Sequence, residues 1–346
     1  MTAHVSPSRP GRVPSLGRGP RRTLETAASP PLPFHFPYVL WWSCRRVEGV
    51  HVPGVRRSAL VGVLLVALGA CTSSPSAPPA SSASSTSSAS PERVYVSLGD
   101  SYATGYQPSA GSSRDGFPHL VAERSGLRLV NLACSGATSA QLRAQPGCAP
   151  ANRAVDAPDP ADRTQLDAAV AALREHRGRV GLVTVVIGGN DLAPCARAAD
   201  ALGCASRAVA DVRANLAAVL PALREAAGDA PIVGLTYPDV FLGAWVSPEF
   251  PDGQDLARLS VTLFRDFFNT ALKAEYDEVG ATFVDVTAAT GGYGPLTETT
   301  EDPTYGRVPT PVARVCALTH FCALTDVHPT PAGHEAIAAA VLEATR

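Results

Sequence analysis

From Arg93 onward, short apolar runs alternate along the chain with longer stretches of helical pattern. Five runs rich in β-branched residues are apolar through much of their length, which is typical of strands buried on both faces. They are residues 94–98, 129–132, 182–187, 232–236 and 282–286. The stretches between and after them predict helices at residues 117–125, 164–176, 205–227, 254–279 and about 331–344. The alternation predicts one α/β domain, residues 93–346, with a parallel sheet covered on both faces and no internal repeat.

The residues before this domain follow another pattern. Arg56 and Arg57 precede an uncharged run, residues 58–70, that ends in Leu-Gly-Ala directly before Cys71. A basic start, a short apolar run and small residues before a cut site predict a secretory signal at residues 55–70. The run is shorter than the roughly 20 residues that span a bilayer. Its ending resembles the bacterial lipoprotein lipobox, which implies that Cys71 becomes the lipidated N-terminus; an ordinary signal peptide followed by a chance Cys is the alternative.

Two further segments flank this signal. Residues 71–92 consist almost entirely of Ser, Ala, Pro and Thr after Cys71, a composition that stays extended and predicts a tether. Residues 1–54 are rich in Pro and Arg and place the signal far from the first Met. We therefore expect translation to begin at a Val such as Val52 or Val55, with residues 1–54 as an extension outside the natural protein.

The charge balance gives no sign of a nucleic-acid partner. The chain has 29 Lys and Arg against 31 Asp and Glu, a net charge of -2, and its visible Arg cluster lies before the signal. A chain without a basic excess gives no indication of nucleic-acid binding. With 45% hydrophobic and 17% charged residues, the composition is ordinary for a soluble enzyme.

The cysteines agree with export. Apart from Cys44 and Cys71, six remain, in the local pairs Cys134 with Cys148, Cys195 with Cys204, and Cys316 with Cys322. Six cysteines allow 15 connectivities, and the short separations favour pairing between neighbours. The even count fits an oxidising compartment. A zinc site is the alternative, but because no Cys-x-x-Cys occurs we expect neither a metal nor another cofactor.

Small polar residues follow the predicted strands at the positions where such sheets bind ligands. The first strand ends in Gly99-Asp100-Ser101, which can expose the Ser101 hydroxyl and aim its backbone N–H at an anion, or can simply begin a helix. After the second strand, Gly136 can bring a backbone N–H close to a ligand or merely form a turn. After the third, Asn190 can donate to an oxyanion or cap the next segment.

A histidine near the C-terminus can supply a general base. His328 lies directly before the last helix, on a loop held rigid by Pro329 and Pro331, and Asp326 could orient its ring. A lone His in this position is more often structural or exposed. The other histidines of the domain, His119, His176, His320 and His334, lack comparable surroundings.

Over residues 93–346 the chain resembles the GDSL/SGNH hydrolase family. The resemblance is carried by four segments in order along the chain: Gly99-Asp100-Ser101, the segment at Gly136, Gly188-Gly189-Asn190-Asp191, and Asp326-Val327-His328-Pro329. The resemblance implies a flavodoxin-like three-layer α/β/α sandwich with Ser101 as nucleophile and His328 as proton shuttle. It also implies an oxyanion hole formed by the N–H groups of Ser101 and Gly136 and the side chain of Asn190. The cysteine pairs and residues 237–241 further resemble secreted actinobacterial esterases and lipases of this family.

One departure concerns the acid. The family pattern has Asp three residues before His, where this chain has Thr325, and Asp326 stands two before. Since some family members use a backbone carbonyl instead, either Asp326 or a carbonyl could orient His328.

The expected activity is hydrolysis of carboxylic esters through an acyl-enzyme, by a monomer that is secreted or held at the membrane by a lipid anchor. The alternatives are an O-acetyl esterase for carbohydrate or peptidoglycan and, in another class, a surface lipoprotein that binds ligands without catalysis. Residues 241–254 and 288–319, with Trp245, Phe250, Tyr293 and Tyr305, are expected to line the acyl pocket. The sequence sets neither the natural ester nor its acyl chain length.

Overall fold

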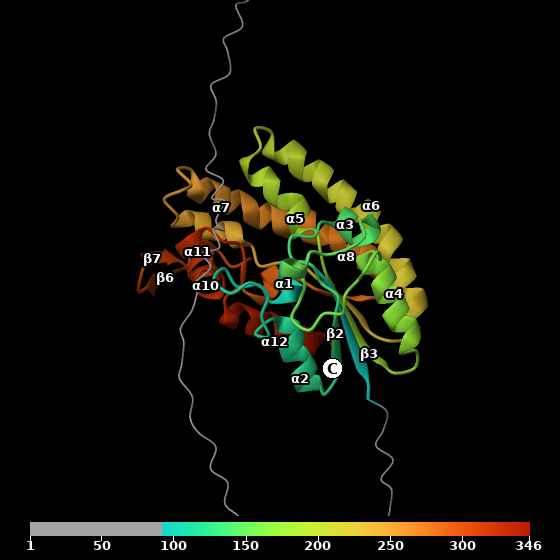
Figure 1. Cartoon of the computed structure of the whole chain (residues 1–346). Helices are drawn as coiled ribbons and strands as arrows, with labels where there is room; N and C mark the ends of the chain where they lie inside the picture. Colours follow the sequence, from blue (N-terminus) through green and yellow to red (C-terminus); the bar gives the residue numbers. More distant parts are fainter. Residues whose placement is uncertain (1–91) are drawn as a thin grey trace, which may run out of the picture. The chain divides into compact units, whose positions relative to one another are not determined.

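A five-stranded parallel sheet lies at the centre of the computed structural model, which describes residues 92–346 (Figure 1). Its strand order is β2-β1-β3-β4-β5. The strands are β1 (Val94–Gly99), β2 (Arg128–Asn131), β3 (Val180–Val186), β4 (Ile232–Leu235) and β5 (Thr282–Val284). Each of the five apolar runs is thus a strand, and the predicted fold class is confirmed. The sheet grows from β1 to β2 on one side and from β1 to β3, β4 and β5 on the other. The carboxyl ends of β1 and β3 therefore flank the switch point, where such sheets bind ligands.

Helices cover both faces of the sheet. The α-helices are α1 (Ser101–Thr104), α2 (Phe117–Ser125), α3 (Ser139–Ala144), α4 (Gln165–Glu175), α5 (Gly189–Leu192), α6 (Ala201–Ala227), α7 (Gly253–Thr262), α8 (Asn269–Asp277), α9 (Val286–Ala289), α10 (Thr310–Leu318), α11 (Phe321–Leu324) and α12 (Pro331–Ala344). Short 3-10 turns are η1 (Pro150–Asn152), η2 (Ala193–Arg197) and η3 (Val240–Trp245). Helices α2 and α12 pack together on one side, while α4, α6 and α8 form the other layer (Figure 1).

The core forms where the apolar strands meet the helix layers. All six residues of β1 are buried. A buried hydroxyl of this strand is paired with one of β3, since the Tyr95 hydroxyl lies 2.7 Å from the Thr184 hydroxyl. Gly234 of β4 lies against the Tyr276 ring of α8, where a Cβ atom would come within 2.3 Å of the ring. Only glycine leaves room for this aromatic ring, which brings α8 close to the sheet.

Several elements differ from the sequence prediction. The helix predicted at residues 254–279 is interrupted by a π-helical segment, η4 (Leu263–Phe268), between α7 and α8. An antiparallel hairpin of β6 (Thr299–Asp302) and β7 (Gly306–Pro309) was not predicted, and neither were α3 and α10. The hairpin's first strand is polar and mostly exposed, so it lacks the apolar pattern on which the prediction depended.

The predicted leader lies outside the described residues. This holds for the extension at residues 1–54, the signal at residues 55–70, Cys71 and the tether up to Pro91. Over residues 92–346, no helix combines the length and the apolar character needed to cross a membrane.

Candidate active site

Ser101 is the first residue of α1, immediately beyond the end of β1. Gly99 adopts φ 144°, and a Cβ there would lie 2.2 Å from the carbonyl oxygen of Val186 in β3. Asp100 caps α1 by accepting a 3.0 Å hydrogen bond from the N–H of Tyr102. The Gly-Asp-Ser sequence therefore brings the chain close to β3, begins the helix and leaves Ser101 8% exposed at the edge of the sheet.

The structure brings Ser101, His328 and Asp326 into one hydrogen-bonded row. The Nε2 atom of His328 lies 2.8 Å from the Ser101 Oγ, and its Nδ1 atom lies 2.7 Å from Asp326 Oδ1. With Nδ1 protonated toward the carboxylate, Nε2 accepts the serine proton. This is the arrangement in which a serine hydroxyl can become a nucleophile.

Burial keeps the imidazole ready to act as a base. The pKa of His328 is lowered from 6.5, mainly because burial disfavours the charged ring, and the nearby Asp326 carboxylate partly opposes this effect. A neutral His328 at neutral pH can take a proton from Ser101.

The backbone of the histidine loop is held by α1. The Tyr102 hydroxyl donates a 2.5 Å hydrogen bond to the carbonyl of Val327. The ring of Tyr106 lies against the His328 ring, with centroids 4.3 Å apart. The helix that begins with the proposed nucleophile thus also contacts the loop that carries its base.

Gln107 and His320 hold the next two carbonyls of the same loop. The N–H of His320 donates to the His328 carbonyl at 3.0 Å, and Gln107 Nε2 donates to the Pro329 carbonyl at 3.0 Å. The two side chains also meet, with 3.1 Å between His320 Nε2 and Gln107 Oε1. His320, which no feature of the sequence singled out, therefore contacts the loop that carries His328. No local motif marks Gln107 or His320.

A buried carboxylate lies beside Ser101. Asp100 accepts a 2.6 Å hydrogen bond from the Tyr237 hydroxyl, and burial raises the pKa of Asp100 to about 7. The ring of Tyr237 packs edge-on against Tyr102, with centroids 4.8 Å apart. Asp100 therefore joins Tyr237, which follows β4, to the turn after β1.

The three groups expected to stabilise an oxyanion follow β1, β2 and β3. Asn190 in α5 uses one amide proton on the Ala137 carbonyl at 3.0 Å, which leaves its second proton for a ligand. Gly136 has φ 82°, and a Cβ there would meet no atom within 4 Å. Among residues 92–346, the backbone N–H groups of Ser101 and Gly136 donate to no other protein group.

A link between two of these segments comes from Ser139. Its hydroxyl and its backbone N–H both donate to the Asp191 carboxylate, which ties the segment after Gly136 to α5.

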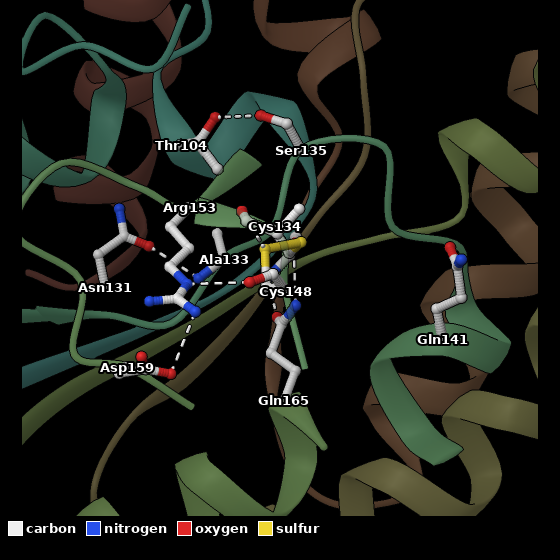
Figure 2. Close-up of a disulfide and its surroundings, with 12 residues drawn as sticks. Thr104, Asn131, Ala133, Cys134, Ser135, Gln141, Cys148, Arg153, Asp159 and Gln165 are labelled. Carbon is white, nitrogen blue, oxygen red and sulfur yellow. Dashed lines mark hydrogen bonds and ion pairs between the residues drawn. A yellow bond between two sulfur atoms is a disulfide. The ribbon is translucent and has the colours of Figure 1, made fainter. Parts of the chain in front are cut away.

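Three disulfides lie near Gly136, Asn190 and His328 in the sequence, and they have the pairing expected from the sequence. They join Cys134 to Cys148, Cys195 to Cys204, and Cys316 to Cys322. Figure 2 shows the first, where Arg153 Nε donates to the Cys148 carbonyl at 2.9 Å and its guanidinium pairs with Asp159. In the same view Thr104 of α1 meets Ser135 at 2.8 Å, so the disulfide loop contacts the helix of Ser101.

A small, mainly apolar cavity of about 70 Å³ opens beside Ser101 and Asn190. Its apolar wall includes Leu192, Tyr237, Phe241, Phe264, Phe268 and Val327. The expectation that residues 288–319 line this pocket was wrong, because none of them does, and of residues 241–254 only Phe241 contributes. A larger cavity of about 500 Å³ lies beside Gly136 and the Cys134–Cys148 bridge, and its lining does not include Ser101.

The remaining histidines of the domain lie apart from these groups. His176 contacts Arg128 and Arg179, and the buried His334 contacts the N–H of Phe117. His119 has a partly buried ring. In the part of the chain from residue 92 to 346, no cluster of three or more His, Cys, Asp or Glu side chains is placed to hold a metal ion.

This chain is similar to several known proteins. A sequence model described as the GDSL-like Lipase/Acylhydrolase family matches residues 97–336. Lipase 2 from Streptomyces coelicolor is 28% identical over 246 residues, which cover 59% of this chain and 73% of that protein. The crystal structure of an extracellular lipase from Streptomyces rimosus is 20% identical with a TM-score of 0.47, covering 73% of this chain and 99% of that one. A phospholipase A1 from Streptomyces albidoflavus gives 17% identity and a TM-score of 0.44, with the same coverage.

Proposed function

The chain belongs to the GDSL-like lipase/acylhydrolase family, and from this membership we propose that it is a serine ester hydrolase in which Ser101 forms an acyl-enzyme. The row of hydrogen bonds from Asp326 through His328 to Ser101 carries this proposal. A serine hydroxyl is a weak nucleophile until a base takes its proton, and here the base is neutral, oriented and in contact.

In the first half of the reaction, Ser101 Oγ attacks the ester carbonyl carbon while His328 Nε2 takes the hydroxyl proton. The carbonyl oxygen becomes an oxyanion that accepts hydrogen bonds from the N–H groups of Ser101 and Gly136 and from the Asn190 amide. His328 then gives its proton to the alkoxy oxygen, the carbon–oxygen bond breaks and the alcohol leaves.

In the second half, water attacks the acyl carbon and passes a proton to His328. The tetrahedral intermediate collapses, the ester bond to Ser101 breaks, and the Ser101 oxygen regains the proton. Asp326 keeps the ring in the tautomer with Nδ1 protonated and stabilises the imidazolium formed in each half. The products are a carboxylic acid and an alcohol.

A binding protein without catalysis is the weaker proposal. Ligand binding alone gives no physical reason for a general base to lie 2.8 Å from a serine hydroxyl at the helix N-terminus. The apolar wall beside Ser101 favours acyl esters over O-acetylated sugars, whose recognition needs several polar groups.

The proposal includes export. The signal pattern before Cys71 and six cysteines in neighbouring pairs support it. We place the lipid anchor on Cys71. Palmitate labelling of the wild type and of Cys71→Ser in a bacterial host tests this, since labelling that persists in the variant contradicts the anchor.

Hydrolysis of p-nitrophenyl esters by the wild type and by Ser101→Ala tests the activity itself. The wild type is expected to release nitrophenol, and the variant to lose on the order of 10⁴-fold or more in kcat while keeping its far-UV circular dichroism. Turnover by the folded variant near the wild-type rate contradicts the proposal.

A further inference from the structure

A second cavity adjoins the one beside Ser101. It has a volume of about 90 Å³ and shares four lining side chains with the first, namely Leu192, Phe241, Phe264 and Phe268. Its remaining wall comes from η2, α6, α7 and η4. The two cavities therefore lie next to each other, with these four side chains common to both walls.

The wall of the second cavity offers little to a polar ligand. Ser260 is the one hydroxyl in its lining, and that hydroxyl donates to Asp239 at 2.7 Å. Cys195 also lines the cavity, and its sulfur is joined to Cys204. All other lining side chains are Ala, Leu or Phe. Such a wall favours a ligand made of methylene groups.

Exposed apolar side chains gather at this cavity. Of the five large hydrophobic side chains exposed within residues 92–346, three line it: Leu202 is 54%, Leu259 42% and Phe267 37% exposed. They come from α6, α7 and η4, so three separate segments present apolar groups to solvent at one place. Scattered exposed hydrophobics need no explanation, but several around an apolar cavity indicate a binding site.

We propose that the acyl chain of the ester extends from Ser101, past Leu192 and Phe241, into this second cavity, so that the preferred substrates are esters of medium or long acyl chains such as hexanoyl and octanoyl. The inference rests on the proposed function. The acyl group stays bonded to Ser101 through both halves of the reaction, whereas the alcohol leaves after the first. An apolar cavity that continues from Ser101 therefore serves the part that remains bound.

A series of p-nitrophenyl esters tests the inference, because it varies the acyl chain and keeps the alcohol constant. Each methylene that becomes buried is expected to raise kcat/KM by about fourfold, which gives about 250-fold for the four methylenes between butanoyl and octanoyl. Ala205→Phe places a ring into the second cavity from α6. It is expected to lower kcat/KM for octanoyl by about tenfold or more and to leave acetyl within about twofold.

Matched variants separate the cavity from general effects. Ala210→Phe makes the same change at an exposed position of α6 outside both cavities and is expected to keep the wild-type chain-length profile. Leu259→Asp puts a charge at the exposed mouth and should lower octanoyl hydrolysis selectively, whereas Thr262→Asp puts the same charge elsewhere on α7 and should not. These surface changes keep the test valid if Ala205→Phe fails to fold.

Two results overturn the inference while leaving the proposed function intact. One is hydrolysis of acetyl and octanoyl esters with equal kcat/KM. The other is a chain-length preference that follows the alcohol, seen as octyl acetate being cleaved much faster than ethyl acetate while the acyl series stays flat. If no ester of either series is cleaved, the proposed function itself fails.

Discussion

One carboxylate oxygen of Asp326 contacts His328 twice: Oδ1 lies 2.7 Å from the ring Nδ1 and accepts a 2.9 Å hydrogen bond from the backbone N–H. Thr325, just before the Asp, has φ 52°, a left-handed conformation that few residues other than glycine adopt. This tight turn places a carboxylate two residues before the histidine in contact with its ring. Within residues 92–346, no backbone carbonyl is hydrogen-bonded to that ring nitrogen, so the geometry favours Asp326 as the orienting group.

Asp326→Asn is therefore expected to lower kcat on the order of 10⁴-fold, because an amide favours the wrong ring tautomer. His328→Ala removes the base itself and should cost more, on the order of 10⁶-fold. Steady-state kinetics on a short p-nitrophenyl ester measure both. Near-wild-type turnover by Asp326→Asn would show that another group orients the ring.

Asn190→Ala is expected to remove about 3 to 4 kcal/mol of transition-state stabilisation, mainly as a lower kcat. The amide proton not used by Ala137 is the one that would meet the oxyanion. Because the same side chain also holds the Ala137 carbonyl, the folding of the variant is checked by thermal unfolding. An effect confined to KM would contradict the oxyanion role.

The pH dependence of kcat/KM should report the ionisation of His328. Only the neutral ring accepts the serine proton, and burial lowers its pKa from 6.5, so kcat/KM should fall as the pH drops below a midpoint under 6.5. The Asp326 charge opposes this lowering, so Asp326→Asn should move the midpoint to still lower pH. Burial raises the pKa of Asp100 to about 7, so any second inflection near that pH is expected to disappear in Asp100→Asn. A midpoint above 6.5 that persists in Asp100→Asn contradicts the assignment.

Gln107→Leu is expected to lower kcat by roughly tenfold with little change in KM, because it removes the donor to the Pro329 carbonyl and the contact to His320. The loop that carries His328 would then sample positions in which His328 is farther from Ser101. Gln254→Leu, at an exposed position of α7, is the matched control. A lower melting temperature with unchanged kcat would show that Gln107 has only a structural role.

The sequence was most informative where burial and chain order decide the structure. Strands β1 and β3 are apolar through much of their length because helices cover both faces, and this pattern is visible in the sequence alone. The hairpin of β6 and β7 was missed because its side chains are largely exposed and polar. The π-helical segment was missed because its apolar residues, such as Phe264 and Phe268, also fit an ordinary helix.

In the candidate site, the sequence indicated the residues that follow the strands. It did not indicate the residues that hold the His328 loop in place. Ser101, Gly136 and Asn190 follow strands, where the fold alone predicts function. Gln107 contacts Pro329 across more than 200 residues, and no local pattern indicates such a contact. The pocket wall was assigned to aromatic loop residues, whereas Phe264 and Phe268 reach it from η4. Which face of a helical segment meets a cavity depends on tertiary packing.

Covalent labelling of Ser101 tests the central claim most directly. A fluorophosphonate reacts with a serine hydroxyl only where a base activates it, so we expect one adduct per chain, mapped by mass spectrometry to the peptide that contains Ser101. His328→Ala should react far more slowly, and Ser101→Ala should not be labelled. An adduct on another residue, or labelling of Ser101→Ala at the wild-type rate, would contradict the assignment of Ser101 as the nucleophile.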